Sequence, residues 1–408
     1  MAEAALTGDQ AIAERRANRF AAIIIVGHAL KHVYIAGFQA VLLPEIKLGL
    51  NLTSAQVGTM ATVQQFSSWG STVTSGYIGD RFVSKTAFML GLSLALIGVS
   101  YFILGIAASY SVLLPAMLLV GLGPSIYHPP AIGALSRRFV SRRAFYISLH
   151  GAGGSVGEAA GPLIAGGLIA VLYWRDVLQL AMIPAFITAF AMWTLLKNEK
   201  SEEGGASSLR EYLGAFRELL KIRAVQLIYL ATAFRTVGQA TTMVFLPNYM
   251  REDLGYSAFL AGAFISMAQV VGIGSQPVMG QLTDRIGYKR VLVPALVCFA
   301  LLLLLVPAAD GKVQLAIVIV LLGTFLFSLH AILIAAAAEM AGESMQAKTV
   351  SLIYSASFVG ALAPTIAGVL ADAYGFEITF LFAAILVGFS ALILAATNLP
   401  GSRAQRGT

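Results

Sequence analysis

The chain has 408 residues, of which 58% are hydrophobic and only 12% are charged, whereas soluble proteins average about 25% charged residues. A soluble protein of this composition could not cover its surface with polar groups. The composition therefore excludes a soluble enzyme or binding domain and predicts an all-α polytopic membrane protein. Because Cys298 is the single cysteine, an internal disulfide is also excluded.

Twelve apolar stretches follow one another along the chain, each long enough to cross a hydrocarbon core of about 30 Å as a helix. They cover residues 20–43, 54–77, 86–107, 111–133, 145–172, 175–196, 224–247, 257–280, 289–308, 312–338, 347–371 and 375–397. The longest polar stretch, 197–223, is predicted to be a cytoplasmic linker between a six-helix bundle at 20–196 and another at 224–397. Residues 1–19 and 398–408 are predicted to be cytoplasmic ends.

The basic residues predict how the chain lies in the membrane. Of the 27 Lys and Arg residues, 21 fall on the side of the N-terminus and four in the loops on the opposite side. This asymmetry places both termini in the cytoplasm and indicates a multi-pass protein of the inner membrane. It also explains the formal net charge of +7 without a nucleic-acid partner. The two remaining basic residues, Lys31 and Arg235, lie inside predicted helices.

The two halves repeat each other at a nearly constant offset of 202 to 204 residues. The repeated features, with the first half named before the second, are Asp80 and Asp284, Arg81 and Arg285, His128 and His330, and Pro162 and Pro364. Several matches in the same order indicate an internal duplication. Two related six-helix bundles with a cavity between them predict a secondary transporter.

A short motif follows the second predicted helix and recurs after the eighth. It consists of Gly76, Asp80 and Arg81, and again of Gly280, Asp284 and Arg285. This pattern resembles the cytoplasmic loop signature of the major facilitator superfamily, which implies a twelve-helix transporter and not an enzyme. An aspartate at a helix end can bind the positive N-terminus of a neighbouring helix, so the motif is predicted to hold one conformation. The alternative is that both aspartates only stabilise a tight turn.

A narrower resemblance lies in two helices of the first half. The run from Ser125 to Pro129, and the glycines from Gly153 to Gly161 that precede Pro162, are similar to the fosmidomycin-resistance family of exporters. Gly157 and Gly161 share one helix face with Gly153 and would let another helix approach closely. Together with a bend at Pro162, this face is predicted to take part in conformational gating, and tight packing alone is the alternative.

Lys31 and Arg235 are 204 residues apart, so the duplication places one cation at an equivalent height in each half. An ionised residue at mid-membrane costs roughly 2.5–3.5 kcal/mol on insertion scales, and such a symmetric pair predicts a binding site for a phosphonate or carboxylate group. The other predicted substrate-binding residues are His28, His32, Gln39, Thr232, Thr236, Gln239, His128 and His330. Alternatively, Lys31 reaches the membrane interface or forms a structural ion pair with Glu158.

Glu158 is the carboxylate that lies deepest in a predicted helix. It is predicted to carry the coupling proton, with His32 and His128 as assistants, because histidine titrates near working pH. The alternative is a static pair with Lys31. His28 and His32 are four residues apart and could share a metal ion, but the sequence shows no third ligand, so neither a metal nor a cofactor is expected.

The sequence thus predicts a monomeric transporter that exports a small organic anion or an amphipathic drug in exchange for protons. An importer or antiporter of an anionic metabolite is the first alternative. A membrane sensor or enzyme that transports nothing is the second, although no loop is long enough for a catalytic domain.

Overall fold

The computed structural model is helical and contains no strand in the residues that it describes, which are 8–81, 85–197, 217–342, 349, 352–353, 355–399 and 401. The N-terminal half consists of α1 (Gly8–Gly37), η1 (Phe38–Leu42), α2 (Leu43–Leu50), α3 (Ser54–Arg81), α4 (Thr86–Ile106), α5 (Tyr110–Arg138), η3 (Val140–Arg142), α6 (Arg143–Ile169) and α7 (Trp174–Leu196). The C-terminal half consists of α9 (Arg223–Glu252), α10 (Ala258–Ile286), α11 (Tyr288–Leu305), α12 (Lys312–Ala341), α14 (Ser357–Gly360), α15 (Ala363–Tyr374) and α16 (Glu377–Ala396). The predicted all-α class is confirmed.

Equivalent helices pack together in the two halves. In the N-terminal half α1 packs on α6, α3 on α5, and α4 on α7. In the C-terminal half α9 packs on α14 and α15, α10 on α12, and α11 on α16. The sequence repeat relates α1 to α9 and α3 to α10, so these are corresponding pairs. Both halves are therefore bundles that share these three helix pairings, although α9 also packs extensively on α16.

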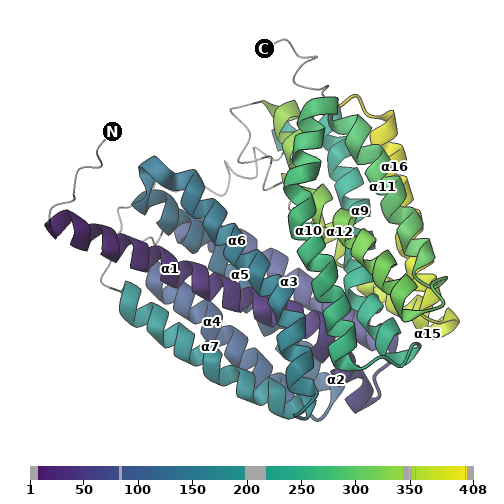
Figure 1. The fold of residues 1–408 in the computed structure, drawn as a ribbon, viewed down its shortest axis with the longest axis horizontal. Helices are drawn as coiled ribbons and strands as arrows, with labels where there is room; N and C mark the ends of the chain where they lie inside the picture. Colours follow the sequence, from purple (N-terminus) through teal and green to yellow (C-terminus); the bar gives the residue numbers. More distant parts are fainter. Residues whose placement is uncertain are drawn as a thin grey trace.

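The two bundles contact each other through α3 with α15 and through α6 with α10. Figure 1 shows the bundles close together near α2 and α15 and spread apart toward the end at which α1 begins. We call the first the closed end and the second the open end. The two bundles therefore meet mainly at the closed end.

Eight helical segments among the described residues are long and apolar enough to cross a membrane. The four remaining spans, formed by α3, α6, α9 and the α14–α15 segment, contain more polar or small residues. α3 is rich in serine, threonine and glutamine, α6 is rich in glycine, and α9 contains Arg235. These four spans also provide contacts across the interface between the bundles, where polar side chains and close approach are of use.

Two helices differ in extent from the prediction. The first, predicted at 20–43, runs from Gly8 to Leu50, and its π-helical segment η1 includes Gln39. π-Helical turns are rare and are found most often at functional sites. The eleventh, predicted at 347–371, is divided in its described part into α14 and α15. Pro364 lies in the first turn of α15, where its missing N–H breaks no helical hydrogen bond.

Candidate functional site

A cavity of about 280 Å³ lies between the two bundles. Its polar wall residues are Gln39, Gln65, Glu158, Thr236, Gln239 and Gln269. Its apolar wall includes Ile35, Met243, Val244 and Phe327. Both bundles contribute to the wall, so movement of one bundle against the other changes the shape of the cavity. The wall combines amide groups, one carboxylate and an apolar surface, which suits a molecule with polar and apolar parts.

The structure divides the predicted substrate-binding residues into two groups. Gln39, Thr236 and Gln239 line the cavity. The others lie outside its wall, inside one bundle or the other: Lys31, His28, His32, His128, Thr232, Arg235 and His330. The cavity itself is therefore less cationic than the sequence suggests.

Gln65 and Gln269 line the cavity but are absent from the predicted site. A signal for them exists in the sequence, because they are 204 residues apart, the same offset as Lys31 and Arg235. Paired amides are a weaker indication of a binding site than paired charges, because an uncharged amide costs less to place inside a membrane helix. Their positions on α3 and α10 make them symmetric counterparts at the interface between the bundles.

Arg235 is held inside the C-terminal bundle and is only 1% exposed. Nη2 donates to Oε1 of Gln239 at 2.7 Å, and Nη1 donates to the carbonyl oxygen of Leu326 at 3.3 Å. Gln239 lines the cavity, so one hydrogen bond connects the buried guanidinium to the cavity wall.

Lys31 is likewise buried, with 2% of its surface exposed, so it does not extend to the membrane interface. Nζ lies 2.6 Å from Nε2 of His128. Glu158 contacts a different residue, since its Oε1 lies 2.9 Å from Nδ1 of His32. The structure therefore pairs lysine with histidine and carboxylate with histidine, and it does not contain the direct Lys31–Glu158 ion pair that was one of the predicted alternatives.

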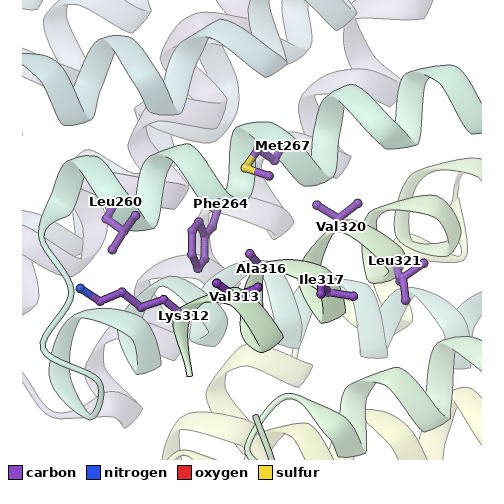
Figure 2. A pocket seen from close by; sticks show the side chains of 9 residues that line it. All are labelled: Leu260, Phe264, Met267, Lys312, Val313, Ala316, Ile317, Val320 and Leu321. Atoms are coloured by element: carbon purple, nitrogen blue, oxygen red, sulfur yellow. The ribbon is translucent and has the colours of Figure 1, made fainter. Parts of the chain in front are cut away.

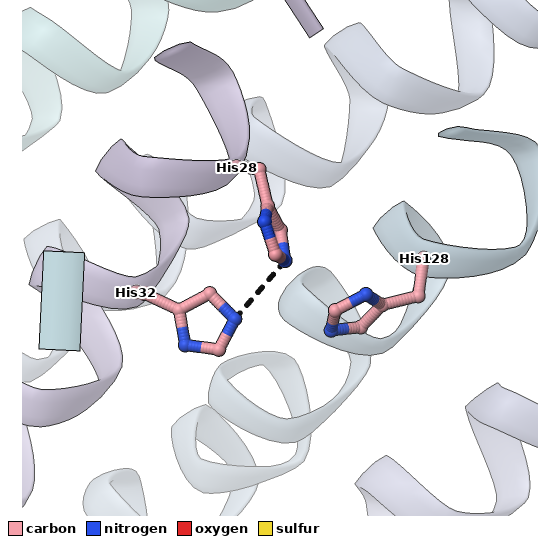
Figure 3. Close-up of side chains that lie close together, drawn as sticks. All are labelled: His28, His32 and His128. Atoms are coloured by element: carbon pink, nitrogen blue, oxygen red, sulfur yellow. Dashed lines mark hydrogen bonds between the residues drawn. The ribbon is translucent and has the colours of Figure 1, made fainter. Parts of the chain in front are cut away.

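Four histidines meet inside the N-terminal bundle. Figure 3 shows the rings of His28 and His32, both from α1, together with His128 of α5. His28 stacks on His150 of α6 with 3.7 Å between ring centroids. The side chains of His28, His32 and His128 each offer one ligand atom, and these atoms lie within 4.8 Å of one another. Two helices, α1 and α5, thus bring together a group of residues that could hold a metal ion.

The glycine face of α6 packs against α1. A Cβ at position 157 would overlap the carbonyl oxygen of Ala29, and a Cβ at position 161 would lie 2.5 Å from the carbonyl oxygen of Val33. These contacts position His32 of α1 next to Glu158 of α6. Close packing therefore accounts for the glycine spacing directly.

We expect Gly157→Ala to destabilise the protein, because the added methyl group meets a backbone atom that cannot move independently. Overpacking of this kind typically costs about 1–3 kcal/mol. The matched control is Gly151→Ala on the same helix, where nothing lies within 4 Å of the added Cβ; alanine there is expected to be neutral or stabilising. Thermal unfolding in detergent would measure both, and equal midpoints would contradict the packing argument.

The closed end is sealed by α3 and α15. Both oxygens of Asp372 accept hydrogen bonds from the first turn of α3, from the backbone N–H of Ser54 at 2.7 Å and of Ala55 at 2.9 Å. A carboxylate at a helix N-terminus satisfies N–H groups that have no partner within the helix. Further along, Thr62 donates to the carbonyl oxygen of Ala361 at 2.7 Å.

Two crossed ion pairs join α2 to the end of α9 at the same end. Lys47 pairs with Glu252, and Arg251 pairs with Glu45, whose Oε1 lies 2.6 Å from Nε of the arginine. Each pair joins the N-terminal half to the C-terminal half. These four side chains are at most 21% exposed, so water screens them less than it screens surface charges.

The duplicated glycine–aspartate–arginine motif, which is predicted to hold one conformation, lies at the open end. Asp284 and Arg285 are exposed near the end of α10, and the chain turns there at Gly287, whose φ of 93° favours glycine. The side chains of the first copy, at positions 76, 80 and 81, lie outside the described part of the structure. The role of the motif stays a prediction.

A second hollow, of about 410 Å³, lies between α10 and α12 (Figure 2). Its wall is apolar except for Lys312, and several of its side chains, such as Met267 and Ile317, are exposed on the outside of the bundle. Because one bundle alone forms this groove, movement between the bundles does not reshape it. The cavity between the bundles is therefore the candidate transport site.

Three known proteins resemble the chain over nearly its whole length. An uncharacterised MFS-type transporter of Bacillus subtilis, YfnC, is 25% identical over 97% of each chain. The fosmidomycin resistance protein of Escherichia coli is 21% identical over 88% of each chain. The crystal structure of a bacterial homologue of the human lysosomal transporter Spinster, inward-facing and unoccupied, superposes with a TM-score of 0.78 at 15% identity, over 94% of this chain and 97% of that one.

The sequence profile of the Major Facilitator Superfamily matches residues 32–282 and 228–408, which together include both bundles. The structural superposition independently supports the twelve-helix fold. The family and the fold are those of transporters and not of enzymes. With its duplicated bundles and the cavity between them, this chain belongs to the major facilitator superfamily.

Proposed function

We propose that this chain exports amphipathic organic molecules from the cytoplasm by alternating access, in exchange for protons. The observation that carries the proposal is the cavity between the bundles, which presents amides, one carboxylate and an apolar wall. Alternating access requires a site that opens to one side of the membrane at a time. A cavity between two bundles that meet at one end satisfies this requirement.

The side to which the cavity opens follows from the distribution of positive charge. The end of α5 and the beginning of α6, with the short η3 between them, lie at the open end and contain Arg137, Arg138, Arg142 and Arg143. The positive-inside rule assigns that end, and with it both termini, to the cytoplasmic face of the inner membrane. The cavity then loads from the cytoplasm. The similarity to a fosmidomycin resistance protein supports export over import.

The amphipathic substrate is favoured over an anion because the two predicted cations do not face the cavity. Lys31 is engaged by His128, and Arg235 lies behind Gln239. Among the residues that the structure describes, the charged side chain in the cavity wall is that of Glu158. A carboxylate beside amides and an apolar wall attracts a neutral or cationic amphipathic molecule and repels an anion. Assignment of the coupling proton to Glu158, His32 and His128 stays a prediction.

Transport by the wild-type protein in inverted membrane vesicles tests the proposal. We expect a fluorescent amphipathic dye to accumulate when the vesicle lumen is acidified, because proton flow out of the lumen then drives the dye in. Accumulation should disappear when a protonophore collapses the gradient, and vesicles without the protein provide the baseline. Dye uptake that is insensitive to the protonophore would exclude proton coupling.

A second candidate function, transport of organic anions, is favoured by the position of Arg235 one hydrogen bond away from the cavity. For this candidate we expect Arg235→Lys to weaken phosphonate binding by about tenfold or more, because lysine lacks the planar fork that binds two oxygens at once. The exposed Arg290→Lys on α11 is the matched control. If both variants bind a phosphonate as the wild type does, the anion candidate fails.

A further inference from the structure

The proton of neutral His28 is fixed by the contact of its Nδ1 atom. Nδ1 of His28 lies 2.7 Å from the backbone carbonyl oxygen of His150, and a carbonyl oxygen can only accept a hydrogen bond. In the neutral form this ring therefore carries its proton on Nδ1 and presents a lone pair at Nε2. Nδ1 of His32 lies 2.9 Å from a carboxylate oxygen of Glu158, with which it forms an ion-pair contact.

The Nε2 atoms of His28 and His32 face each other across a short distance. They lie 3.1 Å apart and share one hydrogen bond (Figure 3). His28 is only 3% exposed, so bulk water does not separate them. A metal ion that replaces the shared proton would be bound by both nitrogens.

A third acceptor lies beside the pair. Nε2 of His128 is 2.6 Å from Nζ of Lys31, which has no acceptor to offer when charged, so this nitrogen too presents a lone pair. The ring of His128 lies 4.7 Å from that of His28 and 5.8 Å from that of His32, measured between ring centroids. Two turns of α1 and one turn of α5 thus direct three imidazoles into one small volume.

We propose that His28, His32 and His128 bind one divalent transition-metal ion of the Zn²⁺ type. Imidazole nitrogens bind Zn²⁺ at about 2.0–2.1 Å, which places two ligands of a tetrahedral site about 3.3 Å apart. The 3.1 Å between the first two nitrogens is close to that spacing. The three ligand atoms lie within 4.8 Å of one another, so His128 must leave Lys31 and move toward the other two rings to complete the site.

The surroundings of the rings have the features of a metal site. Metal-bound histidines usually donate their second N–H to a carbonyl or carboxylate oxygen, which fixes the ring and makes it a better ligand. His150 supplies the carbonyl and Glu158 the carboxylate. Glu158 also lines the central cavity and is 37% exposed. It connects the site to the cavity, from which an ion can enter.

The internal duplication does not repeat this site, so we expect one metal site in each chain. Positions 28 and 32 correspond to Thr232 and Thr236 in the second half, while His128 corresponds to His330. The C-terminal bundle thus retains one of the three ligands and lacks the other two. His330 is the natural control, because it occupies the equivalent helix without the partner imidazoles.

Lys31 opposes binding of the ion. Its ammonium occupies the lone pair of His128 and repels a dication nearby. Binding therefore requires that Lys31 release this contact, and protons compete with the metal for all these groups, so affinity should rise with pH. Replacing Lys31 by methionine keeps most of the side-chain volume and removes the charge.

Titration of the purified, tag-free, full-length protein with Co²⁺ tests the proposal, with Zn²⁺ added as a competitor. We expect one Co²⁺ per chain, with the visible absorption of a tetrahedral site that Zn²⁺ displaces. His128→Ala and His32→Asn should each lose this signal, and His330→Ala should keep it. Glu158→Gln should weaken binding by about 10–100-fold. Lys31→Met should strengthen binding by about tenfold or more.

The result is decisive in either direction. Two variants on different helices are included so that a folding failure of one, detected by size-exclusion chromatography, leaves the other informative. Absence of saturable binding to the wild type overturns the proposal. So does binding that survives in a folded His128→Ala or His32→Asn protein, or binding that is lost in His330→Ala.

Discussion

Gly58→Leu is expected to prevent the closed end from forming and to abolish transport. Gly58 lies on α3 where that helix crosses α15, and a Cβ there would overlap the carbonyl oxygen of Pro364. Backbone atoms cannot move aside without separating the helices. Overpacking costs about 1–3 kcal/mol, which changes the ratio of closed to open molecules by roughly five- to hundredfold.

The matched control is Gly70→Leu on the same helix, where nothing lies within 4 Å of the added Cβ. Labelling of a cysteine introduced at Ser54 would report opening of the closed end, in a background where the native Cys298 is replaced by serine. We expect fast labelling with Gly58→Leu and slow labelling with Gly70→Leu. Equal labelling together with normal transport would show that the α3–α15 contact does not limit access.

Glu158→Gln is expected to weaken binding of cationic amphipathic substrates by roughly 10–100-fold, since hydrogen bonds to charged groups contribute about 1.5–3 kcal/mol. The reason is that Glu158 is the charged side chain in the cavity wall. Binding of a neutral molecule with the same apolar part should change little. Fluorescence titration of the purified protein with both molecules measures the difference.

Glu377→Gln is the control for a general effect of charge, because Glu377 is exposed at the beginning of α16, away from the cavity. It should leave both affinities unchanged. An equal loss of cationic and neutral binding in Glu158→Gln would mean that the substitution disturbs the contact with His32 and that the carboxylate does not bind substrate charge.

Apolar length and the repeat of charged residues are sufficient to predict the twelve helices and their pairing into two bundles. These features are properties of single helices and of sequence offsets. The division of helix 11 is less visible, because Pro364 is compatible both with a bend and with the first turn of a new helix. The first helix continues to Leu50, beyond the end of its apolar stretch. Apolar length alone could not predict this extension.

The candidate site could be predicted only in part, because spacing fixes the face of a helix but not its neighbour. Lys31 and Glu158 both belong to the N-terminal bundle, yet they do not contact each other. The orientation of α1 places Lys31 in contact with His128 and His32 in contact with Glu158. Asp372 lies near a helix end, as its position in the sequence implies, but its hydrogen bonds to α3 connect residues more than 300 positions apart. No local pattern encodes such a contact.

The crossed ion pairs of the closed end have a consequence for how the membrane potential acts on transport. Glu45 and Lys47 belong to one half, and Arg251 and Glu252 to the other. Each half thus contributes one positive and one negative charge, and their sum is zero on both sides of the interface. Moving one elementary charge across a membrane potential of 100 mV changes its free energy by about 2.3 kcal/mol. Because these four side chains contribute no net charge to either half, their separation adds no such energy. Any voltage dependence of transport must then arise elsewhere, from the cargo, the coupling ion or the charged side chains inside the bundles, which include Lys31, Glu158 and Arg235.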